Sequence, residues 1–283
     1  MTHPALQPEA TAVVTGGAAG IGLAAALRFA QAGLNVVIAD LGPERLAQAA
    51  DRIAEASPHG APAVMAVEAS VARAEDLDRL ETAVADRFGG TDVLMNNAGI
   101  QPGSAIFGPV ENWERVFAVN LWGVIHGSRV FLPGMIARGR PGLVINTGSK
   151  QGITTPPGDP AYNLTKAGVK AFTEALAHEL RNTPGSAVTA HLLIPGFVFT
   201  ELTRGDRDEK PAGAWTPEQT VDFMLARLEA GDFYILCPDN DVPRGLDEKR
   251  IAWAAGDVIE NRPALSRWHP DWAEAFAAFV AKP

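Results

Sequence analysis

Short apolar runs alternate with longer runs of helical periodicity along the chain, and this alternation restricts the fold more than any other feature. Strand-like runs occupy residues 11–15, 34–39, 62–67, 92–95, 142–147, 188–194 and 233–236. Helical patterns occupy residues 43–56, 74–88, 112–137, 161–181 and 217–230. Such alternation is typical of a parallel sheet with helices on both faces. The sequence predicts an α/β fold, a doubly wound parallel sheet of about seven strands.

A glycine-rich turn joins the first predicted strand to the first helical pattern. Between Thr15 and Gly22 the chain reads TGGAAGIG, so the glycines follow a G-x-x-x-G-x-G spacing. Glycines in such a turn let the backbone approach a pyrophosphate and leave the helix N-terminus directed at its charge. Because the turn lies between a strand and a helix, it indicates dinucleotide binding.

The second predicted strand ends in an acid, Asp40, eighteen residues after Gly22. At this place a carboxylate accepts hydrogen bonds from the adenosine ribose and repels a 2′-phosphate. The next two residues, Leu41 and Gly42, provide no arginine for such a phosphate. The prediction is NAD rather than NADP. The alternative is that Asp40 only caps the helix that opens at Pro43.

A serine, a tyrosine and a lysine form the candidate reactive group. Tyr162 and Lys166 are four residues apart at the start of a helical pattern, so they share a face, and Ser149 lies thirteen positions before the tyrosine. A free tyrosine has a pKa of about 10, and a nearby cation favours its phenolate. The serine hydroxyl is suited to hydrogen-bond a reacting oxygen. Taken alone, the three also fit a surface aromatic, a solvated charge and a turn residue.

Together with further motifs, these residues resemble the short-chain dehydrogenase/reductase family. The motifs are TGxxxGIG, Asn96-Asn97-Ala98-Gly99, Asn120, Ser149, Tyr162-x-x-x-Lys166, and Pro195-Gly196 with Thr200. Their order and spacing follow the family over about residues 10–236. The resemblance implies a Rossmann-type fold and an NAD-dependent alcohol dehydrogenase or carbonyl reductase.

The resemblance also implies roles for the candidate catalytic residues. Tyr162 would be the general acid/base, and Lys166 would hold the nicotinamide ribose and lower the pKa of the tyrosine. Ser149 would orient the substrate oxygen, and Asn120 would anchor a water in the proton relay. Tyr162 and Lys166 would therefore contact the cofactor as well.

Further cofactor contacts are implied along the chain. They comprise Gly16, Gly20, Ile21 and Gly22 at the pyrophosphate, Asp40, Leu41, Asn97, Ala98 and Gly99 at the adenosine ribose, Ser70 and Val71 at the adenine, and Pro195, Val198 and Thr200 at the nicotinamide. Ser70 stands where the family usually has an aspartate, so we expect a weaker adenine contact.

Charge and composition exclude several other classes of function. The formal net charge is −9 without a lysine/arginine cluster, which argues against nucleic-acid binding. No leader-like segment opens the sequence, and no apolar run approaches about 18 residues, so we expect a cytoplasmic protein. Six scattered histidines predict no metal site, and the single cysteine, Cys237, excludes an internal disulfide.

We expect one dinucleotide-binding and catalytic domain over residues 1–283, because no linker divides the chain. Residues 238–283, with helical patterns at 246–260 and 271–280, would form a C-terminal extension that packs on the core or covers a neighbouring subunit. The family commonly pairs the helices at 112–137 and 161–181, so a homodimer or homotetramer is implied. Apolar residues expected at exposed positions of these helices are Val124, Phe131, Val169 and Ala171.

Substrate specificity is expected in three segments, residues 103–109, 156–160 and 201–215. Lys150 and Gln151, beside Ser149, are also candidates to face the pocket. Bulky neighbours would favour a secondary alcohol on an apolar body: Ile106, Phe107, Ile153, Phe197 and Phe199. One alternative is a non-catalytic NAD(H)-binding sensor or scaffold. Another is an epimerase or dehydratase acting on a nucleotide sugar, for which the tail after Cys237 looks too short.

Overall fold

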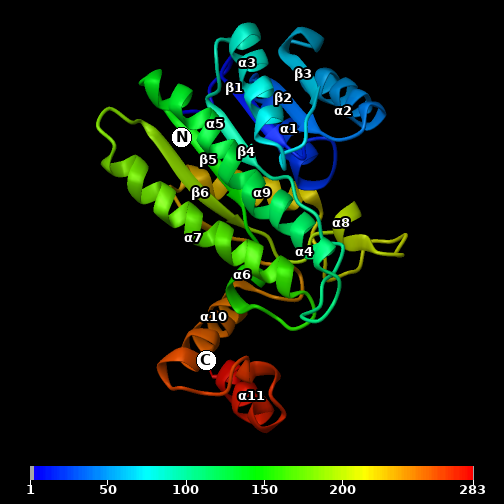
Figure 1. Ribbon diagram of the computed structural model, residues 1–283, viewed down its shortest axis with the longest axis vertical. Coiled ribbons are helices and arrows are strands. Elements are labelled where there is room, and N and C mark those ends of the chain that lie inside the picture. The colour runs from blue at the N-terminus through cyan, green and yellow to red at the C-terminus, as the bar shows by residue number, and fades with distance from the viewer. Residues whose placement is uncertain (1–2, 283) are drawn as a thin grey trace.

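Seven parallel strands form one sheet in the order β3-β2-β1-β4-β5-β6-β7 (Figure 1). The computed structural model describes residues 3–282. The strands are β1 Thr11–Thr15, β2 Asn35–Asp40, β3 Val64–Glu68, β4 Val93–Asn96, β5 Gly142–Thr147, β6 Val188–Ile194 and β7 Tyr234–Leu236. Strand order reverses between β1 and β4, where such sheets open a crevice beyond their carboxyl ends. The predicted doubly wound α/β fold is confirmed.

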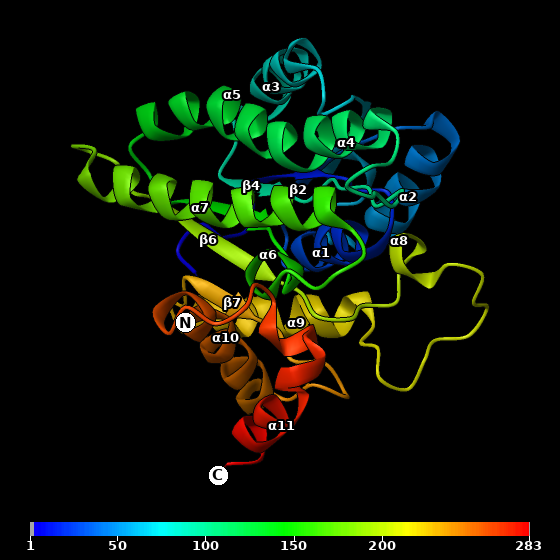
Figure 2. The same ribbon diagram turned by 60° about the horizontal axis from the view of Figure 1, so that its bottom comes forward.

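Helices cover both faces of the sheet (Figure 2). One face carries α1 Gly20–Gln31, α2 Pro43–Ala56 and α9 Pro217–Glu229, and the other carries α3 Ala74–Phe88, α4 Val110–Phe117, α5 Gly123–Ala137 and α7 Pro160–Asn182. Two short helices, α6 Gln151–Thr154 and α8 Glu201–Arg204, lie in segments for which the sequence predicted no helix. Within residues 3–282, no helix has the length and apolar character that crossing a membrane requires.

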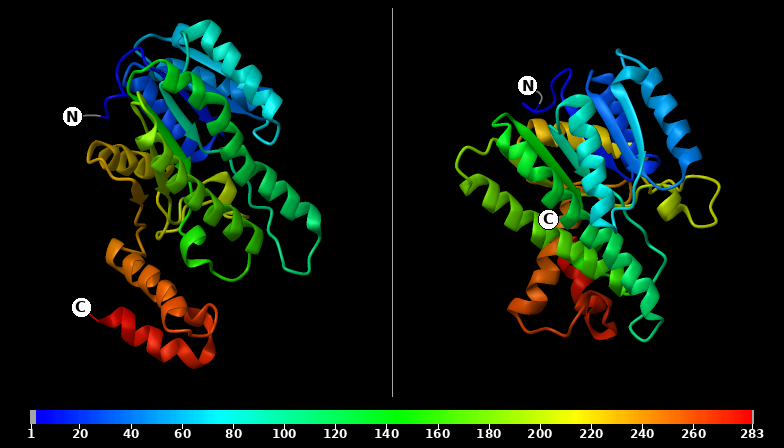
Figure 3. Two further views of the ribbon diagram at one scale, coloured as in Figure 1. Left: turned by 60° about the vertical axis from the view of Figure 1, so that its left-hand side comes forward. Right: turned by 45° about the horizontal axis from the view of Figure 1, so that its top comes forward.

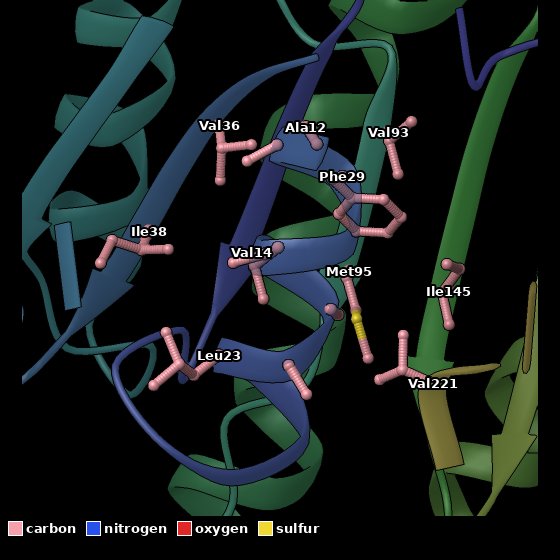
Figure 4. Close-up of a cluster of buried hydrophobic side chains, with 14 of the residues drawn as sticks. Ala12, Val14, Leu23, Phe29, Val36, Ile38, Val93, Met95, Ile145 and Val221 are labelled. Carbon is pink, nitrogen blue, oxygen red and sulfur yellow. The ribbon is translucent and has the colours of Figure 1, made fainter. Parts of the chain in front are cut away.

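The main core lies between the sheet and the helices α1 and α9. Phe29 of α1 packs among Val14 of β1, Met95 of β4 and Val221 of α9 (Figure 4). All four side chains are buried, because the parallel strands are covered on both faces and read as continuous apolar runs. Truncating a buried phenylalanine typically costs about 3–5 kcal/mol, so this cluster holds α1 and its glycine turn in place.

The helix predicted over residues 112–137 is interrupted, which the sequence did not indicate. Between α4 and α5, residues Ala118–Trp122 form a π-helical turn in which the N–H of Gly123 donates to the carbonyl of Ala118. Such turns are rare and occur mostly at functional sites. Asn120 lies at the centre of this turn and is fully buried.

The expected exposure of apolar residues on α5 and α7 is wrong at three positions. Val124, Phe131 and Val169 are buried, because these faces of the two helices pack against the sheet. Trp122 and Leu164 are exposed instead, at 51% and 53%.

The chain after β7 forms a C-terminal arm, residues 238–282, that projects from the sheet (Figure 3). The arm contains α10 Arg244–Ile259 and α11 Ala273–Ala281, with 3-10 turns at Ser266–Trp268 and Pro270–Trp272 between them. Trp253 of α10 lies 5.4 Å from the ring of Phe276 and 5.2 Å from that of Phe279, and its Nε1 donates to Ser266 Oγ at 2.7 Å. Arg262 stacks on Trp253 at 4.0 Å. The arm therefore has a small aromatic core of its own.

Candidate functional site

A cavity of about 470 Å³ opens at the carboxyl ends of the central strands. The structure brings most of the predicted site residues to its wall: Gly16, Gly20, Ile21, Asp40, Leu41, Ser70, Val71, Asn97, Ala98, Gly99, Ser149, Tyr162, Lys166, Pro195, Val198 and Thr200. Gly22 and Asn120 lie behind the wall. Gly196 of the Pro195-Gly196 motif and residues 201–203 of an expected specificity segment also line the cavity. The sequence had not singled out the remaining cavity residues, which are Ala19, Ala39, Arg45, Ala69, Ile100, Val119, Thr147 and Gly148.

The glycine turn forms one end of the cavity, and its packing leaves no room for side chains. A Cβ on Gly16 would lie 2.8 Å from the Cα of Ala98, and one on Gly22 would lie 2.1 Å from the carbonyl oxygen of Gly16. Asn97 steadies the turn, because its Nδ2 donates to Gly16 O at 3.2 Å. The helix α1 then begins without a side-chain cap. Its free N–H groups make this end suitable for an anion.

Asp40 ends β2 at the same side of the cavity. Its Oδ2 accepts from the N–H of Ala18 at 3.0 Å, and its Oδ1 accepts from the N–H of Leu41 at 2.8 Å. Arg45, in the first turn of α2, donates to Asp40 Oδ1 at 3.1 Å and contacts Glu201 of α8 at 3.3 Å. This arginine was not predicted, because it lies five residues after Asp40 and the two residues next to Asp40 gave no sign of it. The helix predicted to start at Pro43 could have indicated this arginine, because a residue in the first turn of that helix lies close to the end of the preceding strand.

Tyr162 and Lys166 meet Ser149 at the other end of the cavity. Both residues are buried on α7, with Lys166 Nζ 5.7 Å from the centre of the Tyr162 ring. Lys166 Nζ donates to the carbonyl of Thr147 at 2.8 Å, which ties it to the end of β5. The Ser149 side chain hydrogen-bonds that of Tyr162, and its Oγ also accepts from the N–H of Gln151 at 3.2 Å.

The charge states of this pair differ from the expectation. Burial raises the pKa of Tyr162 to about 12, and the hydrogen bond with Ser149 opposes this only in part. Burial lowers the pKa of Lys166 to about 8. Burial therefore dominates both pKa values, so at neutral pH the tyrosine is a phenol beside an ammonium.

Asn120 holds the segment after β4 from behind the cavity. Its Oδ1 accepts from the N–H of Ile100 at 2.8 Å, and its Nδ2 donates to the Ile100 carbonyl at 2.9 Å. Ile100 itself lines the cavity. Both ends of the Asn120 amide are therefore bonded to backbone, and its role as a water anchor stays a prediction.

The apolar lining at the Tyr162 end also differs from the expected one. None of the five expected residues belongs to the described lining: Ile106, Phe107, Ile153, Phe197 and Phe199. Phe107 is fully exposed, at 100%, in the loop before α4, whereas Ile153 packs into the core beside α7. The apolar wall comes instead from Ile100, Val119, Val198 and Leu202. Of the three proposed specificity segments, only residues 201–215 contribute to the lining.

Comparison with known proteins gives consistent matches. Residues 10–211 match the family model described as short chain dehydrogenase. A D-beta-hydroxybutyrate dehydrogenase of Rhizobium meliloti (strain 1021) is 35% identical over 220 residues, which cover 77% of this chain and 83% of that protein. A 1-deoxy-11-beta-hydroxypentalenate dehydrogenase of Streptomyces exfoliatus is 37% identical over 265 residues, which cover 91% and 93% of the two chains.

A solved structure shows the same arrangement of elements. A short chain dehydrogenase/reductase from Burkholderia phymatum, in complex with NAD, aligns with a TM-score of 0.81 at 27% identity. The alignment covers 93% of this chain and 98% of that one.

Proposed function

This chain belongs to the short-chain dehydrogenase family of oxidoreductases, and from that premise we propose that it transfers a hydride between NAD(H) and a secondary alcohol or its ketone. One observation carries the proposal. A buried phenol, a hydroxyl and an ammonium meet at one end of a cavity whose other end has a glycine turn and a strand-end carboxylate. The two ends suit a reacting alcohol and an adenosine, respectively.

The residues present fit a dinucleotide. Gly16 and Gly22 have no space for a Cβ, so the turn packs closely against its neighbours, and the uncapped start of α1 suits a pyrophosphate. Asp40 lies where it can accept from ribose hydroxyls, and its charge disfavours a 2′-phosphate. We therefore propose NAD(H) as the cofactor.

Each polar group at the Tyr162 end has a task in this proposal. When bound, the cofactor would accept the hydride of the alcohol or return it to the ketone. Tyr162 donates the proton to the ketone oxygen in reduction and removes the hydroxyl proton in oxidation. Lys166, held by Thr147, stabilises the phenolate that reduction leaves behind. Ser149 hydrogen-bonds the substrate oxygen as its charge changes.

The apolar wall supports an alcohol on an apolar body. The charged side chains of the described lining are Asp40, Arg45, Lys166 and Glu201. Only Lys166 among them belongs to the Tyr162 end, so we propose a substrate whose carbinol carbon carries apolar groups. The two relatives named above act, by their names, on a hydroxybutyrate and a hydroxypentalenate. A non-catalytic NAD(H) sensor would have no use for the phenol, hydroxyl and ammonium together.

We further propose that the whole chain works as one dinucleotide-binding and catalytic domain, with the arm as its extension. Trp122 and Leu164 expose apolar area on neighbouring helices, which supports a homodimer or homotetramer.

Replacing Tyr162 by phenylalanine tests the proposal. Tyr162→Phe should lower turnover at least about a thousandfold, because it removes the group that transfers the proton. Binding of NADH, measured by calorimetry, should stay within about twofold, because the ring remains in place. Tyr234→Phe is the matched control, since this second tyrosine lies on β7 and bonds Glu174. Wild-type-like turnover by Tyr162→Phe would exclude the proposed chemistry.

A further inference from the structure

A buried charge cluster lies directly behind the Tyr162 end of the cavity. Lys150 Nζ is 2.6 Å from Asp247 Oδ2 and 3.2 Å from Asp239 Oδ2. The side chains are 15%, 5% and 6% exposed, respectively. Neither Lys150 nor its neighbour Gln151 belongs to the described cavity lining, so Lys150 points away from the pocket.

The cluster joins two parts of the chain that are far apart in the sequence. Lys150 follows Ser149, Asp239 follows β7, and Asp247 lies in the first turn of α10. Gly196 separates the cluster from the cavity, because a Cβ there would lie 2.5 Å from Asp239 Oδ2 and 2.8 Å from Lys150 Nζ. The cluster therefore joins the start of the C-terminal arm to the wall of the cavity.

Hydrogen bonds connect the cluster to two pieces of that wall. The N–H of Lys150 donates to the carbonyl of Pro195 at 3.3 Å, and the N–H of Phe197 donates to Asp239 Oδ2 at 3.3 Å. The residue after Ser149 is therefore fixed in two ways. The backbone of Lys150 is bonded to Pro195, and its side chain is bonded to Asp239, which also binds the N–H of Phe197. Pro195 and Gly196 line the cavity beside Ser149.

Stability alone does not account for this arrangement. Burial raises the pKa of Asp247, against the opposing effect of Lys150, so the site disfavours its own carboxylate charge. Buried ion pairs are in general no more stabilising than apolar residues of the same volume, although losing one partner is costly. A charged pair with directional hydrogen bonds can also fix the placement of the groups around it.

We propose that Lys150 is a positioning residue: its ammonium, held by two buried carboxylates, fixes Ser149 and the wall at residues 195–197 relative to Tyr162. This inference rests on the proposed function. It assigns the C-terminal arm a role in catalysis, since the arm supplies Asp247. Reaction rates are sensitive to such placement, because a displacement of about 1 Å can cost about a hundredfold in rate.

Kinetics of two variants test the inference, with wild-type turnover measured first on 3-hydroxybutyrate, cyclohexanol and 1-phenylethanol. Lys150→Met should lower kcat by about tenfold or more, counted per NADH-binding site, while the Kd for NADH stays within about twofold. The isotope effect on kcat with an alcohol deuterated at its carbinol carbon should rise, because the hydride step becomes slower. Lys150→Arg should recover part of the rate.

Two further variants make the outcome decisive. Asp247→Asn preserves shape and the Lys150–Asp239 pair, so it should fold and lower kcat in the same direction by a smaller factor. Lys170→Met is the matched control, because it removes a lysine that pairs with Glu174 on the outside of α7. The inference would be overturned if folded Lys150→Met kept the wild-type kcat and isotope effect. If only Asp247→Asn folds, the same result in that variant would overturn it. Lack of wild-type turnover on every alcohol would instead refute the proposed function.

Discussion

At the scale of single residues, Lys166 shows a conflict between stability and the proposed chemistry. Its ammonium is buried and donates a hydrogen bond to Thr147 O, and burial lowers its pKa to about 8. An unfolded lysine keeps its proton to a pKa of about 10.5. Between pH 8 and 10.5 the unfolded state therefore binds more protons than the folded state, and this group makes the folded state more stable as the pH rises.

The variant Lys166→Met removes this dependence. Between pH 7 and pH 9.5, wild type should gain about 2 kcal/mol of unfolding free energy relative to Lys166→Met, since one pKa unit corresponds to about 1.4 kcal/mol. Urea unfolding of both proteins at each pH measures the difference in their unfolding free energies. The effects of all other titrating groups are the same in both proteins and cancel in this difference. A constant difference across this range would mean that Lys166 keeps its ordinary pKa.

Asp40 and Arg45 offer a second test at the same scale. Asp40→Ala removes the charge that repels a 2′-phosphate and releases Arg45 from its ion pair. NADPH affinity relative to NADH should rise about tenfold or more, because hydrogen bonds to charged groups contribute about 1.5–3 kcal/mol. Adding Arg45→Ala should cancel the gain. Calorimetric titration with NADH and NADPH measures this change in relative affinity. If Asp40→Ala kept the wild-type preference for NADH, the role of Asp40 would be limited to its hydrogen bonds with the glycine turn and α2.

These residues also show how far the sequence alone reaches. Tyr162 and Lys166 were placed correctly because a four-residue spacing on a helix fixes a shared face. Ile106 and Phe107 were misplaced because the conformation of a loop depends on contacts that no local pattern records. The pKa of Tyr162 was misjudged for a related reason: burial depends on the whole fold, whereas the expected charge effect needed only one neighbour.

At the scale of elements, the main difference from the sequence prediction is the π-helical turn between α4 and α5. The sequence around it has ordinary helical periodicity, so a continuous helix was the natural expectation. The turn centres on Asn120, whose amide bonds both backbone groups of Ile100. The short helices α6 and α8 were missed because one turn of helix is too short to show a period.

Removing the Asn120 amide tests what the turn contributes. Asn120→Ala leaves the backbone groups of Ile100 without their partners, and an unsatisfied buried group costs about 1–3 kcal/mol. Chemical denaturation should show a loss in this range, and amide exchange at Ile100 should become faster. Asn182→Ala, at the exposed end of α7, is the control and should cost less. Equal losses in both variants would show that the Ile100 contacts are not special.

At the scale of the whole molecule, two exposed apolar surfaces are candidates for the proposed subunit contact. Trp122 and Leu164 lie on the α5 and α7 side, whereas Val258 and Ile259 lie on the projecting arm. The sequence motifs placed an interface on the helices but contained no information on the direction of the arm, because its residues lie beyond the matched family segment.

Light scattering after size exclusion distinguishes the two surfaces. Trp122→Glu should lower the mass of the assembly to that of a single chain of 29.9 kDa, because a charge at a packed interface is desolvated without a partner. Val258→Glu, on the arm, should leave the mass unchanged. The reverse result would assign the interface to the arm, and a 29.9 kDa wild type would exclude a stable oligomer.

The two ends of the cavity are formed mainly by different parts of the chain. The glycine turn and Asp40, at the adenosine end, precede the loop after β4, whereas Ser149, Tyr162 and Lys166 follow it. The later segment also sends Glu201 back to Arg45 at the adenosine end. The two groups of segments meet where β1 lies beside β4, at the reversal of strand order. Genetic exchange within the loop after β4 would therefore replace the nucleotide preference of a relative while leaving its reactive groups intact. A single recombination event could therefore produce an enzyme that combines the cofactor preference of one relative with the substrate preference of another.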